Sequence, residues 1–327
     1  MNFSRKKIIY AVLFPLFVLL LTVSCSSTNV TSAEEYYSLG TAYFDLGRYE
    51  EAEKWFNRAR TVDKTKTASE YNLGRIAFET GRYAEAARHF ESILARDPSN
   101  ITALKAAAYT RIKTGDYDKA EDLYARVLQL VPESADDGYN YALVLYAIKK
   151  YEKAAEVLAS YSFALEENNE LLLLYARSLG ALGRIEAADY YAKWLVNGSD
   201  SLVSYEYARI LEQGELYAKA LEQYQQALTT LPADNTEPGK AGLHFTIARL
   251  LLIADSEGGK GMEELQAAVN EGFADTDLMT ALLADKRIRN TDKEEIQKII
   301  AEMQGKVRKE PEASEADIEA DTGDGNK

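Results

Sequence analysis

Few side chains in this 327-residue sequence are placed to do chemistry. The two histidines, His89 and His244, lie far apart, and no cluster of Cys, His, Asp or Glu has the spacing of a metal site. The stretch over residues 258–261 looks faintly like a phosphate-binding loop. However, Ala254 stands at its first glycine position, and Gly261 stands where Ser or Thr would hold magnesium. We therefore expect no catalytic residue, no metal, no cofactor and no enzymatic activity.

The one cysteine, Cys25, stands where a lipid could be attached. Three basic residues near the start precede an apolar run from residue 8 to residue 23, which is the layout of a secretory signal. The sequence of residues 21–24, Leu-Thr-Val-Ser, resembles the lipobox of bacterial lipoproteins, whose cysteine receives diacylglycerol and becomes the new N-terminus. The resemblance implies that residues 1–24 are a signal peptide, that Cys25 is lipidated and that residues 25–32 form a linker. The alternative is an uncleaved membrane anchor in which Cys25 has no role.

Either alternative places the rest of the chain outside the cytoplasm and attached to a membrane, on the periplasmic side of the bacterial cell envelope. Ser26 follows Cys25, and the lack of an Asp at that position favours the outer membrane. Residues 1–24 contain three of the 38 basic residues and none of the 52 acidic ones, so their removal leaves a formal charge of −17. We therefore expect no nucleic-acid partner, because phosphates need a positively charged surface.

Small residues recur at intervals of 34 positions along most of the chain. One series holds Gly40, Gly74, Ala108 and Ala142, and a second holds Ala52, Ala86, Ala120 and Ala154. A period of this length with two small positions indicates a helix–turn–helix unit that stacks on copies of itself. In the first unit, Gly40 and Ala52 are small because the two helices cross there, and Phe56 fills the space beside the crossing. The expected fold class is therefore all-α.

These residues resemble the tetratricopeptide repeat family from about residue 33 to residue 235. The resemblance implies an α-solenoid of about six to seven repeats, each made of a first helix (helix A) and a second helix (helix B). We expect six repeats, over residues 33–66, 67–100, 101–134, 135–168, 169–200 and 201–234. A degenerate repeat and a helical C-terminal cap should follow over residues 241–303, because the last repeat needs a cover. Residues 304–327 are acidic and poor in large apolar side chains, so we expect a disordered tail.

In this family helix A lines the concave face, and the second, fifth, ninth and twelfth residues of each repeat point outward; the fifth, ninth and twelfth are considered for the groove. At these positions twelve residues form the predicted partner-binding groove: Tyr37, Phe44, Tyr71, Arg75, Phe78, Lys105, Tyr109, Tyr139, Tyr146, Arg177, Tyr205 and Arg209. Tyrosine and arginine are favoured at binding hot spots, so we expect the groove to hold a peptide or helix segment of another envelope protein. The alternative is that many of these rings pack between neighbouring helices as part of the repeat core.

The expected function is that of a membrane-anchored scaffold or adaptor on the periplasmic side, in outer-membrane protein or appendage assembly. Its partners would be another protein, through the groove, and the membrane, through the N-terminal lipid or anchor. Two alternatives remain open. One is a regulator that recruits a cell-wall enzyme, and the other is a surface-exposed lipoprotein that contacts host molecules.

Overall fold

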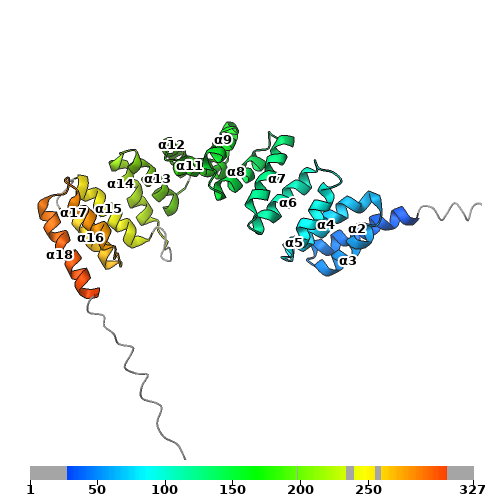
Figure 1. The fold of residues 1–327 in the computed structure, drawn as a ribbon, viewed down its shortest axis with the longest axis horizontal. Helices are drawn as coiled ribbons and strands as arrows, with labels where there is room; N and C mark the ends of the chain where they lie inside the picture. Colours follow the sequence, from blue (N-terminus) through cyan, green and yellow to red (C-terminus); the bar gives the residue numbers. More distant parts are fainter. Residues whose placement is uncertain (1–27, 197, 233–238, 255–258, 308–327) are drawn as a thin grey trace, which may run out of the picture. The chain divides into compact units, whose positions relative to one another are not determined.

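The structure is a computed structural model that describes residues 28–196, 198–232, 239–254 and 259–307. Within these residues all regular secondary structure is α-helical, and consecutive helices pair through short turns (Figure 1). The predicted all-α solenoid of helix–turn–helix repeats is confirmed. The predicted signal peptide, Cys25 and the acidic residues from 308 onward lie outside the described residues. In the described ranges, no helix is both long enough and apolar enough to cross a membrane.

The chain divides into two compact units after residue 164. The N-terminal unit contains α2 (Thr28–Asp45), α3 (Tyr49–Ala59), α4 (Asp63–Glu79), α5 (Tyr83–Leu94), α6 (Ile101–Lys113), α7 (Tyr117–Leu130), α8 (Ala135–Ala147) and α9 (Tyr151–Ala159). The C-terminal unit contains α11 (Asn169–Ala181), α12 (Ala187–Leu195), α13 (Ser201–Gln213), α14 (Tyr217–Thr229), α15 (Lys240–Ala254), α16 (Lys260–Asn270), α17 (Thr276–Ala284) and α18 (Asn290–Val307). The division falls within the short helix α10 (Ser162–Glu167).

Three helix ends differ from the boundaries that the sequence predicts. Residues 28–32, expected as part of a linker, belong to α2, because no Gly or Pro separates them from the first repeat. Helix α4 begins at Asp63, before the expected start of the second repeat at residue 67. Helix α18 continues to Val307, past the expected start of the tail at residue 304. Its buried residues Ile296 and Ile300 hold this helix on the cap core, which favours continuation of the helix.

In the first two repeats, a glycine of helix A meets an aromatic ring of helix B. A Cβ atom on Gly40 would lie 2.7 Å from Cδ1 of Phe56, and a Cβ atom on Gly74 would lie 2.6 Å from Cε1 of Phe90. Carbon atoms in contact are about 3.5–4.0 Å apart, so even an alanine would push the helices apart at these positions. The helix crossing that the sequence predicts therefore depends on glycine against the ring of Phe56, and not only on Ala52.

Neighbouring repeats pack through other residues of helix A. Leu73 and Ile76 of α4 form one buried cluster with Ala52 and Phe56 of the preceding repeat. Leu39 holds the position of Leu73 one repeat earlier, yet it is 41% exposed whereas Leu73 is 3% exposed. The reason is that no described helix pair precedes α2, so nothing in the described part of the chain covers Leu39.

The turn between helix A and helix B places one residue in the left-handed region. Gly47, Gly81, Gly115 and Gly183 occupy this position, with φ between 68° and 76°. In the first turn, the amide of residue 47 donates to the carbonyl of residue 44, and the amide of residue 48 donates to that of residue 43, as in a helix C-cap. Lys149 and Glu215 hold the same position in the fourth and sixth repeats, with φ 61° and 59°. Both are strained, because a Cβ atom disfavours this conformation.

The last four helices of the C-terminal unit share one core. Its buried members include Phe245, Leu252, Leu265, Met279, Leu282, Ile288, Ile296 and Ile300, which come from α15, α16, α17, α18 and the α17–α18 connection. Helices α15 and α16 form the helix pair of the degenerate repeat, and α17 and α18 cover it. The cap is therefore packed into the fold, and this packing shapes the pocket described below.

Candidate functional site

The predicted fifth-position tyrosines of the first two repeats lie on helix A and are half-buried, because each ring packs against helix B of the same repeat. The Tyr37 ring packs on Phe56 with centroids 5.5 Å apart, and the Tyr71 ring packs on Phe90 at 5.6 Å. The Tyr37 hydroxyl also accepts a hydrogen bond from Asn72 Nδ2 at 3.1 Å. These rings therefore combine partial exposure with a packing role, so replacing them would lower stability as well as alter the surface.

The other predicted fifth-position residues of the N-terminal unit also interact with their surroundings. Lys105 Nζ lies 2.6 Å from Oδ1 of Asp137 on α8, and Asp137 is only 3% exposed. Tyr139 on the same helix is half-buried. The charge of Lys105 thus neutralises a buried carboxylate and joins α6 to α8, which ties this residue to the structure of the repeats.

The twelfth position of one repeat and the ninth position of the next lie together in the N-terminal unit. The guanidinium carbon of Arg75 is 4.2 Å from the centroid of the Phe44 ring, and the Phe78 and Tyr109 rings are 5.2 Å apart. With the equivalent residues of the next repeats these form the helix-A stripe, defined as Phe44, Arg75, Phe78, Tyr109, Ile112, Leu143 and Tyr146. Within the helix-A stripe Tyr109 is 47% exposed, Leu143 is 39% exposed and Arg75 is also exposed.

Each ring at a twelfth position rests on the first ring of the following helix B. The centroid separations are 5.5 Å for Phe44 and Tyr49, 5.3 Å for Phe78 and Tyr83, and 5.1 Å for Tyr146 and Tyr151. Aromatic pairs at these distances contribute about 0.5–1.5 kcal/mol beyond the area that they bury. These contacts therefore fix the twelfth-position rings of the helix-A stripe in the unbound protein.

The C-terminal unit uses the predicted groove positions differently. Arg177 Nε donates to Glu206 Oε2 at 2.9 Å, so its charge is shared with a neighbouring helix A. The Tyr205 ring packs on Tyr224 at 5.7 Å, and the guanidinium carbon of Arg209 is 6.0 Å from the Tyr205 centroid. The twelfth positions of this unit hold Gly180 and Glu212 and no aromatic ring. The aromatic stripe is therefore a property of the N-terminal unit.

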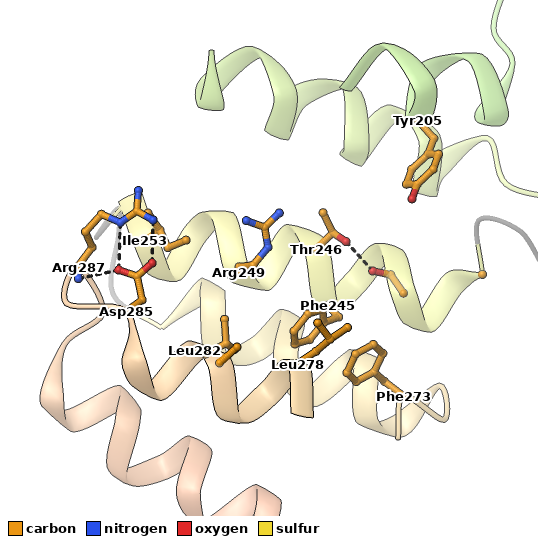
Figure 2. Close-up of a pocket in the computed structure, with 13 residues that line it drawn as sticks. Tyr205, Phe245, Thr246, Arg249, Ile253, Phe273, Leu278, Leu282, Asp285 and Arg287 are labelled. Carbon is orange, nitrogen blue, oxygen red and sulfur yellow. Dashed lines mark hydrogen bonds and ion pairs between the residues drawn. The ribbon is translucent and has the colours of Figure 1, made fainter. Parts of the chain in front are cut away.

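A pocket of about 520 Å³ lies in the C-terminal unit, and the sequence did not predict it (Figure 2). Its wall includes Tyr205 from α13, Phe245 and Arg249 from α15, Phe273 from the α16–α17 connection and Arg287 from the α17–α18 connection. The Phe245 and Phe273 rings stack with centroids 4.2 Å apart and planes 8° from parallel. The pocket thus has an aromatic base with two guanidinium groups beside it.

Ion pairs hold both guanidinium groups of this pocket. Arg249 Nη2 donates to Glu212 Oε1 at 2.6 Å, and the Tyr224 hydroxyl donates to Glu212 Oε2 at 3.0 Å. Burial, followed by the charge of Glu212, raises the pKa of the Tyr224 hydroxyl, so it stays protonated as a donor. Arg287 Nη2 and Nε donate to Asp285 at 2.7 and 3.0 Å, and these bonds lower the pKa of the Asp285 carboxyl to about 2.

Part of this pocket could have been found by extending the repeat frame. Counting from Ala241, Phe245 and Arg249 occupy the fifth and ninth positions of the degenerate repeat. The groove that the sequence predicts ends at the sixth repeat and therefore includes neither residue. Phe273 and Arg287 belong to connections in the cap, where no repeat position applies, and only the packing of α15 with α17 brings them to the same place.

The two histidines have separate partners. His89 Nδ1 lies 2.8 Å from Glu70 Oε1, and His244 Nδ1 lies 2.6 Å from Glu264 Oε2. Each pair joins helix A to helix B of a single repeat. Among the residues that the structure describes, no group of three or more His, Cys, Asp or Glu side chains is placed to hold a metal ion.

Comparisons with known proteins assign the repeats to a family. Residues 31–99 and residues 77–137 match tetratricopeptide repeat families, and residues 113–194 match the family described as anaphase-promoting complex, cyclosome, subunit 3. With the stacked helix pairs of the fold, these matches show that residues 31–137 consist of tetratricopeptide repeats. Scaffolds of this class are typically non-catalytic.

Two solved structures share the fold at low sequence identity. A tetratricopeptide repeat protein from Parabacteroides merdae is 20% identical, with 77% of this chain and 98% of that one covered and a TM-score of 0.52. YrrB, described as a tetratricopeptide repeat protein with an unusual peptide-binding site, is 20% identical, with 55% of this chain and 93% of that one covered and a TM-score of 0.51. No curated protein matches the sequence. At this identity the likeness establishes the fold alone.

Proposed function

We propose that the chain is a non-catalytic adaptor that binds a segment of another protein along the helix-A stripe. One observation carries the proposal: large side chains stay exposed on that stripe although a repeat core lies beneath them. Tyr109 is 47% exposed and Leu143 is 39% exposed, and Arg75 is exposed beside the Phe44 ring. Apolar side chains that gather on one exposed face usually mark a partner site.

The way in which the stripe is built also supports binding. The twelfth-position rings are already held by the rings of Tyr49, Tyr83 and Tyr151, so they lose little freedom when a partner binds. Tyrosine and arginine offer a large contact area with a polar end, and these are the residues that dominate binding hot spots. The description of YrrB as peptide-binding is a parallel for such use of this fold.

The adaptor is proposed to act in the bacterial cell envelope, tethered by a lipid on Cys25 at the periplasmic face of the outer membrane. The support is the sequence of residues 1–25, with its basic start, apolar run and lipobox-like residues before the cysteine. Its partner would then be another envelope protein, in outer-membrane protein or appendage assembly. The alternatives of a cell-wall enzyme regulator and of a host-contact lipoprotein differ in the partner captured and in surface exposure.

The binding proposal is tested by comparing two leucine variants of similar exposure. Leu143→Ser removes a side chain of the helix-A stripe, whereas Leu130→Ser removes one that is 43% exposed at the end of α7, on helix B. After cross-linking in cells and purification of the tagged full-length protein, mass spectrometry should identify a partner that the wild type and Leu130→Ser capture. Leu143→Ser should capture less of it, and the combination Tyr109→Ser/Leu143→Ser should lose it. Equal capture of that partner by all four proteins would overturn the proposal.

The tether is tested separately from the binding. If the signal is cleaved only after lipidation, Cys25→Ser should accumulate as an uncleaved precursor that still carries residues 1–24 and runs at a higher molecular mass than the processed wild type. Retention of Cys25→Ser in the membrane at its original molecular mass would instead support an uncleaved anchor. Protease treatment of intact cells should leave the wild type uncut, and cleavage under those conditions would favour the surface-exposed alternative.

A further inference from the structure

The pocket of the C-terminal unit offers more specific chemistry than the stripe of the N-terminal unit. We propose that it binds an extended peptide segment in which a bulky apolar residue and an acidic residue are separated by one residue. The inference rests on the proposed function, since it names a peptide chemistry for a protein-binding scaffold. The pocket and the helix-A stripe are different surfaces, so either proposal can fail without the other.

The base of the pocket suits an apolar side chain. Phe245 and Leu282 are 5% and 3% exposed, and the Phe245 ring stacks with Phe273. Leu278, at the N-terminal end of α17, is 49% exposed and lines the same pocket. The volume of about 520 Å³ falls within the range of small-ligand sites, and it leaves room for a leucine-sized or larger side chain.

The wall of the pocket carries directed hydrogen-bond donors. Among the described residues, Arg249 donates a hydrogen bond only to Glu212, through Nη2, so Nε and Nη1 keep N–H groups for a ligand. The Tyr224 hydroxyl binds the other oxygen of Glu212, and this second bond fixes the ion pair. Figure 2 shows Arg249 on α15 facing the space between this helix and Tyr205. A guanidinium group that is already oriented can receive a second carboxylate at a lower entropic cost than a mobile one.

The spacing of the base and the wall selects an extended peptide. Phe245 and Arg249 are four residues apart on α15, so their Cα atoms lie on one face of the helix at an axial separation of about 6 Å, with the Phe245 ring directed toward the cap and the Arg249 guanidinium toward α13 (Figure 2). In an extended peptide, residues i and i+2 face the same side and are about 6.6–6.8 Å apart. An apolar residue over Phe245 therefore places an acidic residue two positions away beside Arg249, and directly adjacent residues would face opposite sides.

The repeat frame supports a peptide as the occupant. Phe245 and Arg249 hold the fifth and ninth positions of their repeat, which are the positions that place Tyr71 and Arg75 on helix A of the second repeat. Tyr205 holds the fifth position of the preceding repeat and lines the pocket from α13. The pocket is thus lined by the helix-A positions of its own unit, which are the positions that the proposed function uses in the N-terminal unit.

The experiment measures binding of labelled synthetic peptides to the full-length protein purified in detergent. The reference peptide carries Leu-Ser-Glu between Gly-Ser spacers and is capped at both ends, so glutamate is its only carboxylate. Three control peptides carry Leu-Ser-Gln, Ala-Ser-Glu and Leu-Glu. We expect the reference peptide to bind at least tenfold more tightly than each control in fluorescence anisotropy. Equal affinities for the Glu and Gln peptides would overturn the carboxylate assignment, and undetectable binding of the reference peptide would overturn the proposal.

Two variants connect this binding to the pocket. Leu278→Asp places a negative charge at the pocket and should lower the affinity for the reference peptide at least tenfold. Leu216 is 43% exposed and does not line the pocket, so Leu216→Asp should leave that affinity unchanged. Arg249→Gln should abolish the preference for Glu over Gln. Equal effects of the two Leu variants would overturn the site. If the reference peptide does not bind while partner capture still depends on Tyr109 and Leu143, only the pocket proposal is overturned. If the peptide binds as expected while capture does not depend on Tyr109 and Leu143, only the stripe proposal is overturned.

Discussion

The two units place different chemistry on the same repeat positions. In the N-terminal unit, the twelfth position of one repeat and the ninth of the next hold Phe44 with Arg75 and Phe78 with Tyr109, which build an exposed aromatic surface. In the C-terminal unit, the corresponding pair is Glu212 with Arg249, an ion pair joined to the buried Tyr224. The helix pairing is shared, so the outward residues distinguish the aromatic stripe from the ion-paired wall of the pocket, to which the cap adds Phe273 and Arg287.

The largest effect should come from removing a core ring of one unit. Phe90 is 2% exposed and meets both Gly74 and Tyr71, so Phe90→Ala should lower the free energy of unfolding by about 3–5 kcal/mol. Each unit contains one tryptophan, Trp55 or Trp194, which allows urea unfolding to be followed separately after replacing the other by Phe. The Trp55 transition should move to lower urea while the Trp194 transition stays in place. Equal shifts of both would show that the two units unfold together.

A smaller effect concerns a buried carboxylate that joins two repeats of the N-terminal unit. Glu121 on α7 is 9% exposed and accepts hydrogen bonds from Lys150 and Lys153 at 2.6 and 2.8 Å. Burial raises the pKa of the Glu121 carboxyl, but the hydrogen bonds and the positive charges of the two lysines together outweigh burial and hold the pKa below its ordinary value of 4.5. Glu121→Gln should therefore lower the free energy of unfolding by about 1–3 kcal/mol at neutral pH.

The same carboxylate gives this prediction a pH signature. Because the pKa is lower in the folded state, the stabilisation is present above pH 4.5 and is lost as the pH falls through the folded pKa below that value. Denaturant unfolding at several pH values should show the difference between wild type and Glu121→Gln shrinking only below pH 4.5. The exposed Glu156 on α9 offers a control, since Glu156→Gln should change little at any pH. A difference that is independent of pH would contradict the assignment.

The turn residues allow a matched change in each unit. Lys149 and Glu215 hold the left-handed position that glycine holds in four other repeats. Lys149→Gly and Glu215→Gly should each raise the free energy of unfolding by about 1 kcal/mol, because glycine adopts this conformation without steric cost. Gly115→Ala should have the opposite sign and a similar size. Thermal unfolding measures all three, and destabilisation by both glycine variants would show that the lysine and glutamate side chains contribute more than the strain costs.

The smallest expected effect on stability belongs to the proposed binding surface. Leu143→Ser and Leu130→Ser replace side chains that are 39% and 43% exposed, so each should change the free energy of unfolding by only about 0.5 kcal/mol. Circular dichroism and denaturant unfolding should show the two variants alike, while only Leu143→Ser affects partner capture. A loss of several kcal/mol for Leu143→Ser would identify this residue as part of the core.

Patterns in the sequence predicted the helix pairs but not the interactions of every outward side chain. Tyr71 lies on helix A at the expected position, yet its ring packs on Phe90, which the repeat position alone does not reveal. Lys105 also lies on helix A at the predicted fifth position, but the repeat pattern does not reveal that its partner is Asp137 of the next repeat. The place of residues 28–32 just after Cys25 predicts a linker, whereas α2 already begins at Thr28, because no helix-breaking residue stands there.

The sequence by itself determined the repeating helix pairs, because the small residue at the helix crossing and the left-handed residue in the turn, a glycine in four repeats, are local steric requirements that return every 34 residues over the first four repeats. Only the tertiary structure decided where the pocket lies. Its walls come from the fifth and ninth positions of α15 and from two connections of the cap, and no periodic pattern relates them. They meet because α17 and α18 must cover the apolar face that the last helix pair leaves open.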